Sequence, residues 1–171
     1  MKQTVFKYGL IGAGIMAGLI LIIFLFNSGK PNFEWGQVIG YASMIIALST
    51  IYLGIKSYRD EHQAGIISFS KAFTVGILIS LFACLVYVIV WLIYLQTDAG
   101  SGMMDEYMAY SLQQMQERGA DAAEIEQKRQ EYEAFSKMYE NPLVKIGMTF
   151  MEIFPVGLII SLVSALLLKR R

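Results

Sequence analysis

The sequence predicts an all-α membrane protein: a four-helix transmembrane bundle with an extracytoplasmic amphipathic helical insertion between helices 3 and 4. Four long apolar stretches support this prediction, at residues 8–26, 38–55, 72–95 and 146–168. Each has about the 18 to 20 residues that a helix needs to cross a bilayer. Composition agrees, because hydrophobic residues make up 56% of the chain, charged residues only 16%, and the mean hydropathy is +0.50. Soluble domains carry about 25% charged residues.

The first predicted span, residues 8–26, follows the basic residues Lys2 and Lys7. Its apolar run is longer than the ~7 to 15 residues of a signal-peptide core, and it ends without a small-x-small cleavage pattern. We therefore expect a retained membrane helix. Within it, Gly14 and Gly18 form a G-x-x-x-G pair, which lets membrane helices approach each other closely. We expect these two glycines to lie in a helix contact.

The same stretch contains a G-x-G-x-x-A pattern from Gly12 to Ala17, as in a dinucleotide-binding turn. Such a turn needs a buried strand before its glycines and an amphipathic helix after them. Only eight residues precede Gly9, and residues 19–26 are uniformly apolar. The pattern is therefore assigned to helix packing, and no nucleotide cofactor is expected.

The second span, residues 38–55, carries a regular series of small residues. They recur at intervals of three and four, so a helix places them on one face along the whole span. Shorter series of the same kind occur in the third and fourth spans, including Gly76, Ser80, Gly157 and Ser161. In the second span the series predicts a helix contact surface formed by Gly36, Gly40, Ser43, Ala47, Thr50 and Gly54.

Residues 96–141 are the only segment long enough for a subdomain outside the bilayer. An apolar stripe of Met and Leu, a break at Gly119 and a capping sequence at Asp121 predict two amphipathic helices within residues 103–140. The segment holds ten Asp and Glu against four Lys and Arg. This charge argues against contact with anionic headgroups. The two helices are expected to pack on each other, lie on the membrane or bind a partner.

The fourth span, residues 146–168, contains the one acidic residue well inside an apolar stretch, Glu152. It lies about 9 Å inside the span at ~1.5 Å rise per residue, where an unpaired carboxylate is costly. A lysine and a threonine share its helix face, and two tyrosines lie at similar depth on other spans. The candidate intramembrane polar site comprises Glu152, Lys145, Thr149, Tyr41 and Tyr87. We expect a structural acid, and a proton- or cation-linked site is the alternative.

The distribution of Lys and Arg predicts that both termini are cytoplasmic, because cytoplasmic segments are enriched in these residues. The first outside loop then holds only Lys30, and the outside insertion is acidic. His62, the single histidine, lies in the predicted cytoplasmic loop between the second and third spans. Metal sites need three or four ligands, so no metal is expected there. Eight basic residues fall in short cytoplasmic segments: Lys2, Lys7, Lys56, Arg59, Lys71, Lys169, Arg170 and Arg171.

Several stretches carry a family resemblance: Tyr58-Arg59-Asp60, Gly65–Phe69, Lys71–Gly76, Ala123-Glu124-Ile125 and a last span that ends in Lys-Arg. With these, the chain resembles over nearly its whole length a bacterial membrane protein family catalogued as domain of unknown function (DUF) 4199. The resemblance implies four helices in a bacterial inner membrane. None of the shared motifs is catalytic, so the resemblance implies no activity and no site residue.

The 171 residues support a single membrane domain surrounded by the lipid bilayer. The spans offer no nucleophile–base pair, so an enzyme is not expected, and neither a cofactor nor a nucleic-acid partner is predicted. We predict a non-enzymatic integral membrane protein that acts by binding a membrane protein partner or by forming a homo-oligomer. The alternative is a small proton- or cation-linked carrier that uses Glu152.

Overall fold

The computed structural model describes residues 1–26 and 33–170, without the side chains of residues 20, 23–26, 33–35, 37 and 99. Lys30 and Arg171, which enter the orientation prediction, lie outside the described residues. The chain is all-α, as predicted, and no strand forms within the part described. Its helices are α1 (Lys2–Phe26), α2 (Phe33–Leu48), α3 (Thr50–His62), α4 (Phe69–Tyr94), α5 (Asp98–Ser101), α6 (Met103–Glu117), α7 (Ala122–Tyr139) and α8 (Pro142–Leu168).

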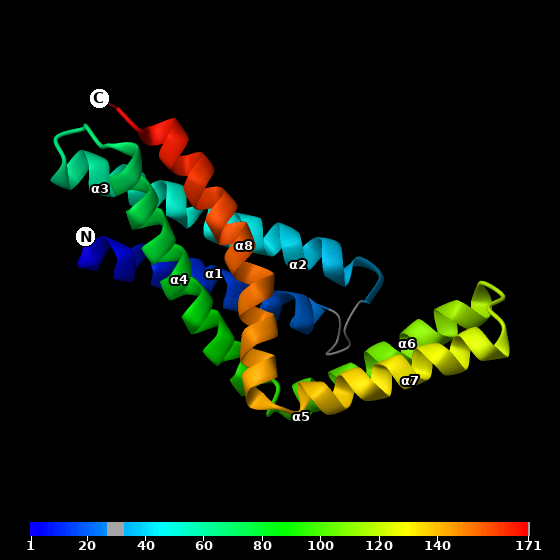
Figure 1. Ribbon diagram of the computed structural model, residues 1–171. Helices are drawn as coiled ribbons and strands as arrows, with labels where there is room; N and C mark the ends of the chain where they lie inside the picture. The colour runs from blue at the N-terminus through cyan, green and yellow to red at the C-terminus, as the bar shows by residue number, and fades with distance from the viewer. Residues whose placement is uncertain (27–32, 171) are drawn as a thin grey trace.

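The long helices α1 to α4 and α8 form a bundle (Figure 1). α4 and α8 are packed along much of their lengths, α1 lies against α4 and α3, and α3 also contacts α8. The core lies where these helices meet, and each contributes at least one side chain with almost no exposed surface. These core residues include Met16, Leu48, Ile51, Ile79 and Ile153.

Small residues bring α4 and α8 into close contact, as their spacing predicted. A Cβ atom on Gly76 would lie only 3.0 Å from the Cβ of Ser161. A Cβ atom on Gly157 would collide with the hydroxyl of Ser80. The hydroxyl of Ser161 donates a 2.7 Å hydrogen bond to the Gly157 carbonyl, which satisfies it within its own helix. Helices in lipid approach this closely only where side chains are small.

The second helical unit is longer than the sequence predicted. α2 and α3 are separated only by Ser49, and together they contain the 25-residue helical stretch Val38–His62. The predicted span ended at Ile55 and His62 was placed in a loop, but the helix continues to His62, so the placement of His62 was wrong. Hydropathy falls after Ile55, but Lys, Arg and Glu are good helix formers. Tyr58 and Arg59 are also buried in the fold, so packing supports the added turns.

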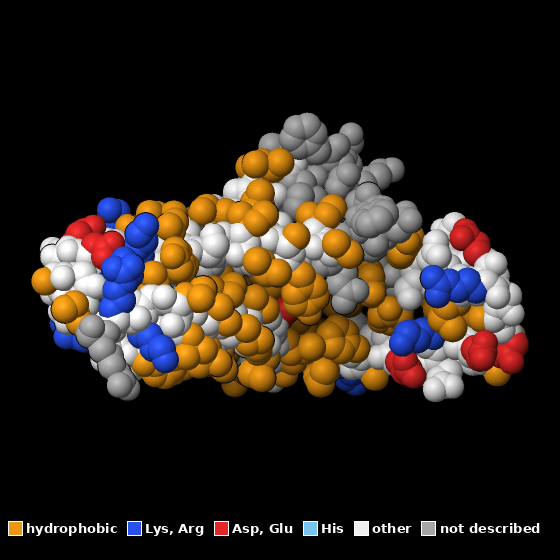
Figure 2. All heavy atoms as spheres, turned by 90° about the horizontal axis from the view of Figure 1, so that it is seen from above, with side chains coloured by type: hydrophobic (Ala, Val, Ile, Leu, Met, Phe, Trp, Pro, Cys, Tyr) orange, Lys and Arg blue, Asp and Glu red, His pale blue; other side chains and the backbone are white. Residues whose placement is uncertain are grey.

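Three helical units within the described residues are long and apolar enough to cross a membrane: Val38–His62, Phe69–Tyr94 and Pro142–Leu168. They contain the second and fourth predicted spans and all of the third except its last residue, Leu95, which caps α4. The first predicted span lies on α1, which has 25 residues, and several of its side chains lie outside the described part. Figure 2 shows hydrophobic side chains over the bundle, between charged side chains at its left end and on the helices at the right.

Both chain termini lie at the same end of the bundle, beside the turn between α3 and α4 (Figure 1). The backbone N–H of Arg170 donates a 3.0 Å hydrogen bond to the Ile67 carbonyl, which ties the end of the chain to this turn. α6 and α7 emerge at the opposite end and project away from the bundle. The fold therefore separates the termini from the acidic insertion along the bundle axis.

Candidate functional site

The helices α5, α6 and α7 form a hairpin, residues 98–139, that is called the hairpin below. Gly119 turns the chain after α6 with a φ of +78°, a conformation that favours glycine. Asp121 then caps α7, because its side chain accepts a 2.8 Å hydrogen bond from the Glu124 N–H. The Glu124 carboxylate accepts a bond from the Asp121 N–H, which completes a capping box. The structure confirms the two helices that were predicted within residues 103–140.

The contact between α6 and α7 covers little apolar surface. The Tyr132 hydroxyl donates a 3.1 Å hydrogen bond to the Ser111 hydroxyl, and the rings of Tyr107 and Tyr132 meet edge to face with centroids 5.9 Å apart. Neither helix has a buried residue, and Tyr107 and Met138 are 42% and 50% exposed. An amphipathic helix normally buries its apolar stripe. The chain itself leaves the stripes of the hairpin half covered.

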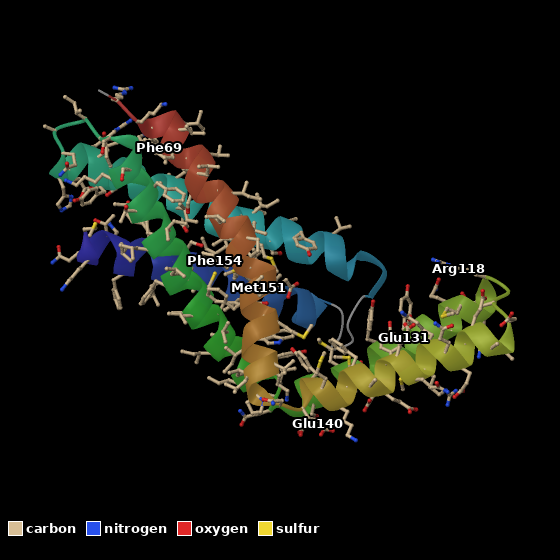
Figure 3. The ribbon with its side chains drawn as sticks, in the orientation of Figure 1. Phe69, Arg118, Glu131, Glu140, Met151 and Phe154 are labelled. Carbon is tan, nitrogen blue, oxygen red and sulfur yellow. The ribbon has the colours of Figure 1, made fainter. Side chains whose placement is uncertain are left out.

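One side of the hairpin carries a cavity of about 310 Å³ between α6 and α7, here called the acidic groove. Its floor is apolar and its rim bears three carboxylates and one ammonium group. No described hydrogen bond or ion pair engages these rim carboxylates. The groove is lined chiefly by Met104, Met108 and Tyr132 on the floor and by Asp105, Glu133, Lys137 and Glu140 on the rim. Figure 3 shows Glu140 where the hairpin meets the bundle.

A second groove of about 410 Å³ shares Met104 and Tyr132 and lies beside Lys128 and Glu131. Its two charges neutralise each other, because the Lys128 ammonium lies 2.9 Å from the Glu131 carboxylate. This hydrogen bond lowers the pKa of Glu131 and raises the pKa of Lys128. The two grooves thus differ in charge: this one is balanced, and the acidic groove has excess negative charge.

An aromatic cluster joins the hairpin to the bundle. The indole N–H of Trp91 on α4 donates a 3.1 Å hydrogen bond to the hydroxyl of Tyr139 on α7. Tyr87 stacks on Trp91 with ring centroids 6.4 Å apart, and the Lys145 ammonium lies 5.7 Å from the centre of the Tyr139 ring. Trp, Tyr and Lys are the residues that gather at a membrane–water interface. The cluster therefore has the composition expected at the level of the headgroups.

The structure brings together only part of the predicted polar site around Glu152. Glu152 interacts electrostatically with the buried Tyr87, yet its side chain is exposed and forms no hydrogen bond with a described residue. Thr149 is buried, and Lys145 is placed over the Tyr139 ring instead. Tyr41 is 45% exposed on α2 and forms no described bond to the carboxylate. Within the described residues, no hydrogen bond joins either tyrosine to Glu152.

The predicted contact surface of the second span divides into two halves. Ser43, Ala47, Thr50 and Gly54 are buried within the bundle. A Cβ atom on Gly54 would lie 3.1 Å from Tyr8 of α1 and would collide with the side chain of Ile79. The other predicted glycines meet no described atom within 4 Å of an added Cβ: Gly14, Gly18, Gly36 and Gly40. The helix contact predicted for these four glycines stays a prediction.

Gly9 and Gly12, which belong to the glycine-rich stretch assigned to helix packing, make close contacts of α1. A Cβ atom on Gly9 would lie 2.6 Å from the Phe82 ring, and one on Gly12 would lie 2.7 Å from the Thr50 hydroxyl. Both belong to the same glycine-rich stretch as Gly14, but they face the core. The sequence of α1 alone does not show which of its glycines face the core. The positions of the neighbouring helices decide this.

Residues that hold metal ions do not gather in the described part of the chain. No group of three or more His, Cys, Asp or Glu comes together there. His62 ends α3 with its ring stacked on Tyr58 at a centroid distance of 5.3 Å. The predicted lack of a metal, of a cofactor and of enzyme activity stays a prediction.

Helices of this length and apolarity indicate a membrane protein, and the hairpin adds a polar helical pair at one end of the bundle. The chain belongs to the family described as protein of unknown function DUF4199, whose model matches residues 7–170. No curated protein and no solved structure shows a significant match. The family membership predicted from the sequence is thus confirmed.

Proposed function

We propose that this chain is a four-span integral membrane protein that acts by binding a protein partner through its extramembrane hairpin. The four spans are α1, the unit α2–α3, α4 and α8, and the surrounding lipid covers their outer faces. Both termini are cytoplasmic in a bacterial inner membrane, and the hairpin is extracytoplasmic. The excess of Lys and Arg at the end with the termini supports this orientation.

The half-covered apolar stripes of the hairpin carry the proposal. Neither α6 nor α7 buries a single residue, and the hairpin meets the bundle mainly through α7 and α8. Large apolar side chains on a polar, projecting element mark an interaction site. A protein partner that covers them would gain about 25 cal/mol for each Å² of apolar surface removed from water. No catalytic step is needed for this role.

Photo-crosslinking in native membranes tests the proposal. A benzoylphenylalanine placed at Tyr107, on the exposed apolar stripe, should form an adduct with one protein, which mass spectrometry identifies and reciprocal purification recovers. The same probe at Gln113, an exposed polar position on α6, is the matched control. Adducts at neither position, or equal adducts with many proteins at both, would contradict a specific partner.

Glu152 supports a second candidate function, a small proton- or cation-linked carrier. Its carboxylate lies on an apolar helix, without a hydrogen bond to the described residues and close to Tyr87. An acidic residue in a span is rare and commonly functional. Glu152→Gln removes the titrating group but keeps the shape, so pH-driven flux in proteoliposomes should be lost if the chain is a carrier. Equal flux from the wild type and the Gln variant would contradict this role.

A further inference from the structure

We propose that the partner of the hairpin contributes a basic amphipathic helix, whose apolar face lies on the floor of the acidic groove and whose Lys or Arg side chains meet its rim. This inference rests on the partner binding proposed above and specifies the chemistry of the partner. It follows from the shape of the groove, from its charge and from the location of the basic residues of the chain itself.

The shape of the groove fits side chains of a third helix. It lies between two antiparallel helices, and a groove of this kind accepts the ridge of another helix. Its volume of about 310 Å³ is at the lower limit of the ~300 to 1,000 Å³ of small-molecule pockets. The floor of Met104, Met108 and Tyr132 is apolar, and methionine adapts its shape to the residue that covers it.

The charge of the groove selects a cationic partner. Asp105, Glu133 and Glu140 surround the floor, and Lys137 compensates only one of them. No described ion pair engages the three carboxylates, whereas Glu131 in the neighbouring groove is paired with Lys128. A partner that brings Lys or Arg on both flanks of an apolar ridge would neutralise the rim. An anionic lipid surface would instead be repelled.

A second copy of the chain is a poor source of this cationic surface, because its hairpin holds more Asp and Glu than Lys and Arg. Two hairpins facing each other would bring their acidic rims together, which is unfavourable. The described basic residues outside the hairpin other than Lys145 lie near the termini or in the α3–α4 region, at the far end of the bundle. Lys145 itself is placed over the Tyr139 ring. A different protein therefore fits the groove better than a second copy does.

Peptide binding to the full chain in nanodiscs tests the inference. The probe is a fluorescent synthetic helix with a Leu face flanked by Lys, and the matched probe has Glu in place of each Lys. Fluorescence anisotropy should show binding of the Lys peptide that weakens as salt rises from about 0.05 to 0.5 M, because salt screens charge pairs. Binding of the Glu peptide with equal affinity would overturn the inference.

Two pairs of substitutions separate the groove from general charge attraction. Glu133→Gln combined with Glu140→Gln should lower the affinity for the Lys peptide by about tenfold at low salt. Glu117→Gln with Glu126→Gln removes two charges elsewhere on the hairpin and should change affinity by less than about twofold. All four side chains are exposed, and thermal melting checks that each variant is folded. Equal effects of the two pairs, or no effect of the groove pair, would overturn the inference.

The crosslink at Tyr107 distinguishes failure of this inference from failure of partner binding itself. The groove variant is the chain with both Glu133→Gln and Glu140→Gln. If this variant binds the Lys peptide as tightly as the wild type and still forms the cellular adduct, the hairpin binds a partner through other residues and the inference is wrong. If the wild-type chain forms no specific adduct, the proposed function is wrong. If the groove variant loses both the cellular adduct and peptide binding, the result supports both the partner binding and the acidic groove as its site.

Discussion

The indole nitrogen of Trp91 and the hydroxyl oxygen of Tyr139 lie 3.1 Å apart, and this hydrogen bond links the end of α4 to the end of α7. The two residues are 48 positions apart in the sequence. The bond fixes the base of the hairpin against the bundle, at the level where Tyr87 and Lys145 also gather. This aromatic cluster therefore helps to set the direction in which the hairpin leaves the bundle.

Trp91→Phe removes the indole N–H and keeps an aromatic ring. We expect faster hydrogen exchange at the base of α7, around Tyr139, with a loss of about 0.5 to 1.5 kcal/mol in local stability. Exchange within α8 should change less than at the base of α7, because Phe keeps an aromatic ring against the core. Uniformly faster exchange across α4 and α8 would mean that Trp91 supports the whole bundle rather than the junction.

Reporter fusions test the proposed topology. Alkaline phosphatase is active only outside the cytoplasm, so a fusion after Asp121 in the hairpin should be active and one after Arg171 inactive. This pattern follows from the Lys and Arg at the end that holds both termini. Strong activity of the carboxyl-terminal fusion would mean that the orientation is reversed or that one of the proposed spans does not cross the membrane.

Ala47→Leu tests the buried half of the series of small residues in the second helical unit. Ala47 has no exposed surface, and its carbonyl lies 3.2 Å from the position of a Cβ on Gly12. Overpacking there should lower stability in detergent by about 1 to 3 kcal/mol. Gly36 and Gly40 form the other half of the series, where an added Cβ would meet no described atom within 4 Å. Gly40→Leu should therefore have a much smaller effect on the monomer. Equal losses at both positions would mean that this half is also a contact, as in an oligomer.

Gly157→Ala tests the contact between α4 and α8. The added methyl group would collide with the Ser80 hydroxyl, so we expect a loss of about 1 to 3 kcal/mol. The Ser80 hydroxyl is buried without a hydrogen-bond partner among the described residues, so Ser80→Ala alone should be nearly neutral. The double variant should recover part of the loss, because it removes the colliding oxygen. Strictly additive effects in this double-mutant cycle would contradict the contact.

Local signals in the sequence predicted the hairpin well. Gly119 and the Asp121–Glu124 capping box act within one turn of the chain, so their effect does not depend on distant residues. The end of the second helical unit was missed, because hydropathy reports the change to polar residues after Ile55 but not the helix that continues to His62.

Contacts between distant segments could not be read from the sequence. Small residues occur on both faces of α1, so Gly14 could not be separated from Gly9 without knowing where Phe82 lies. The hydrogen bond between Trp91 and Tyr139 joins elements 48 residues apart, and nothing local to either residue indicates it. Composition singles out Glu152 as an acid in an apolar span, but only the structure shows that it forms no hydrogen bond with a described residue.

Cysteine accessibility at Met108 most directly tests the claim that a protein partner covers the hairpin. In a Cys84→Ala background, Met108→Cys places a thiol on the floor of the acidic groove, and Gln113→Cys is the control outside it. The account predicts that a maleimide labels Met108→Cys several-fold more slowly in native membranes than in the purified chain, while Gln113→Cys reacts at the same rate in both. Equal labelling of Met108→Cys in the two preparations would contradict a partner at this site.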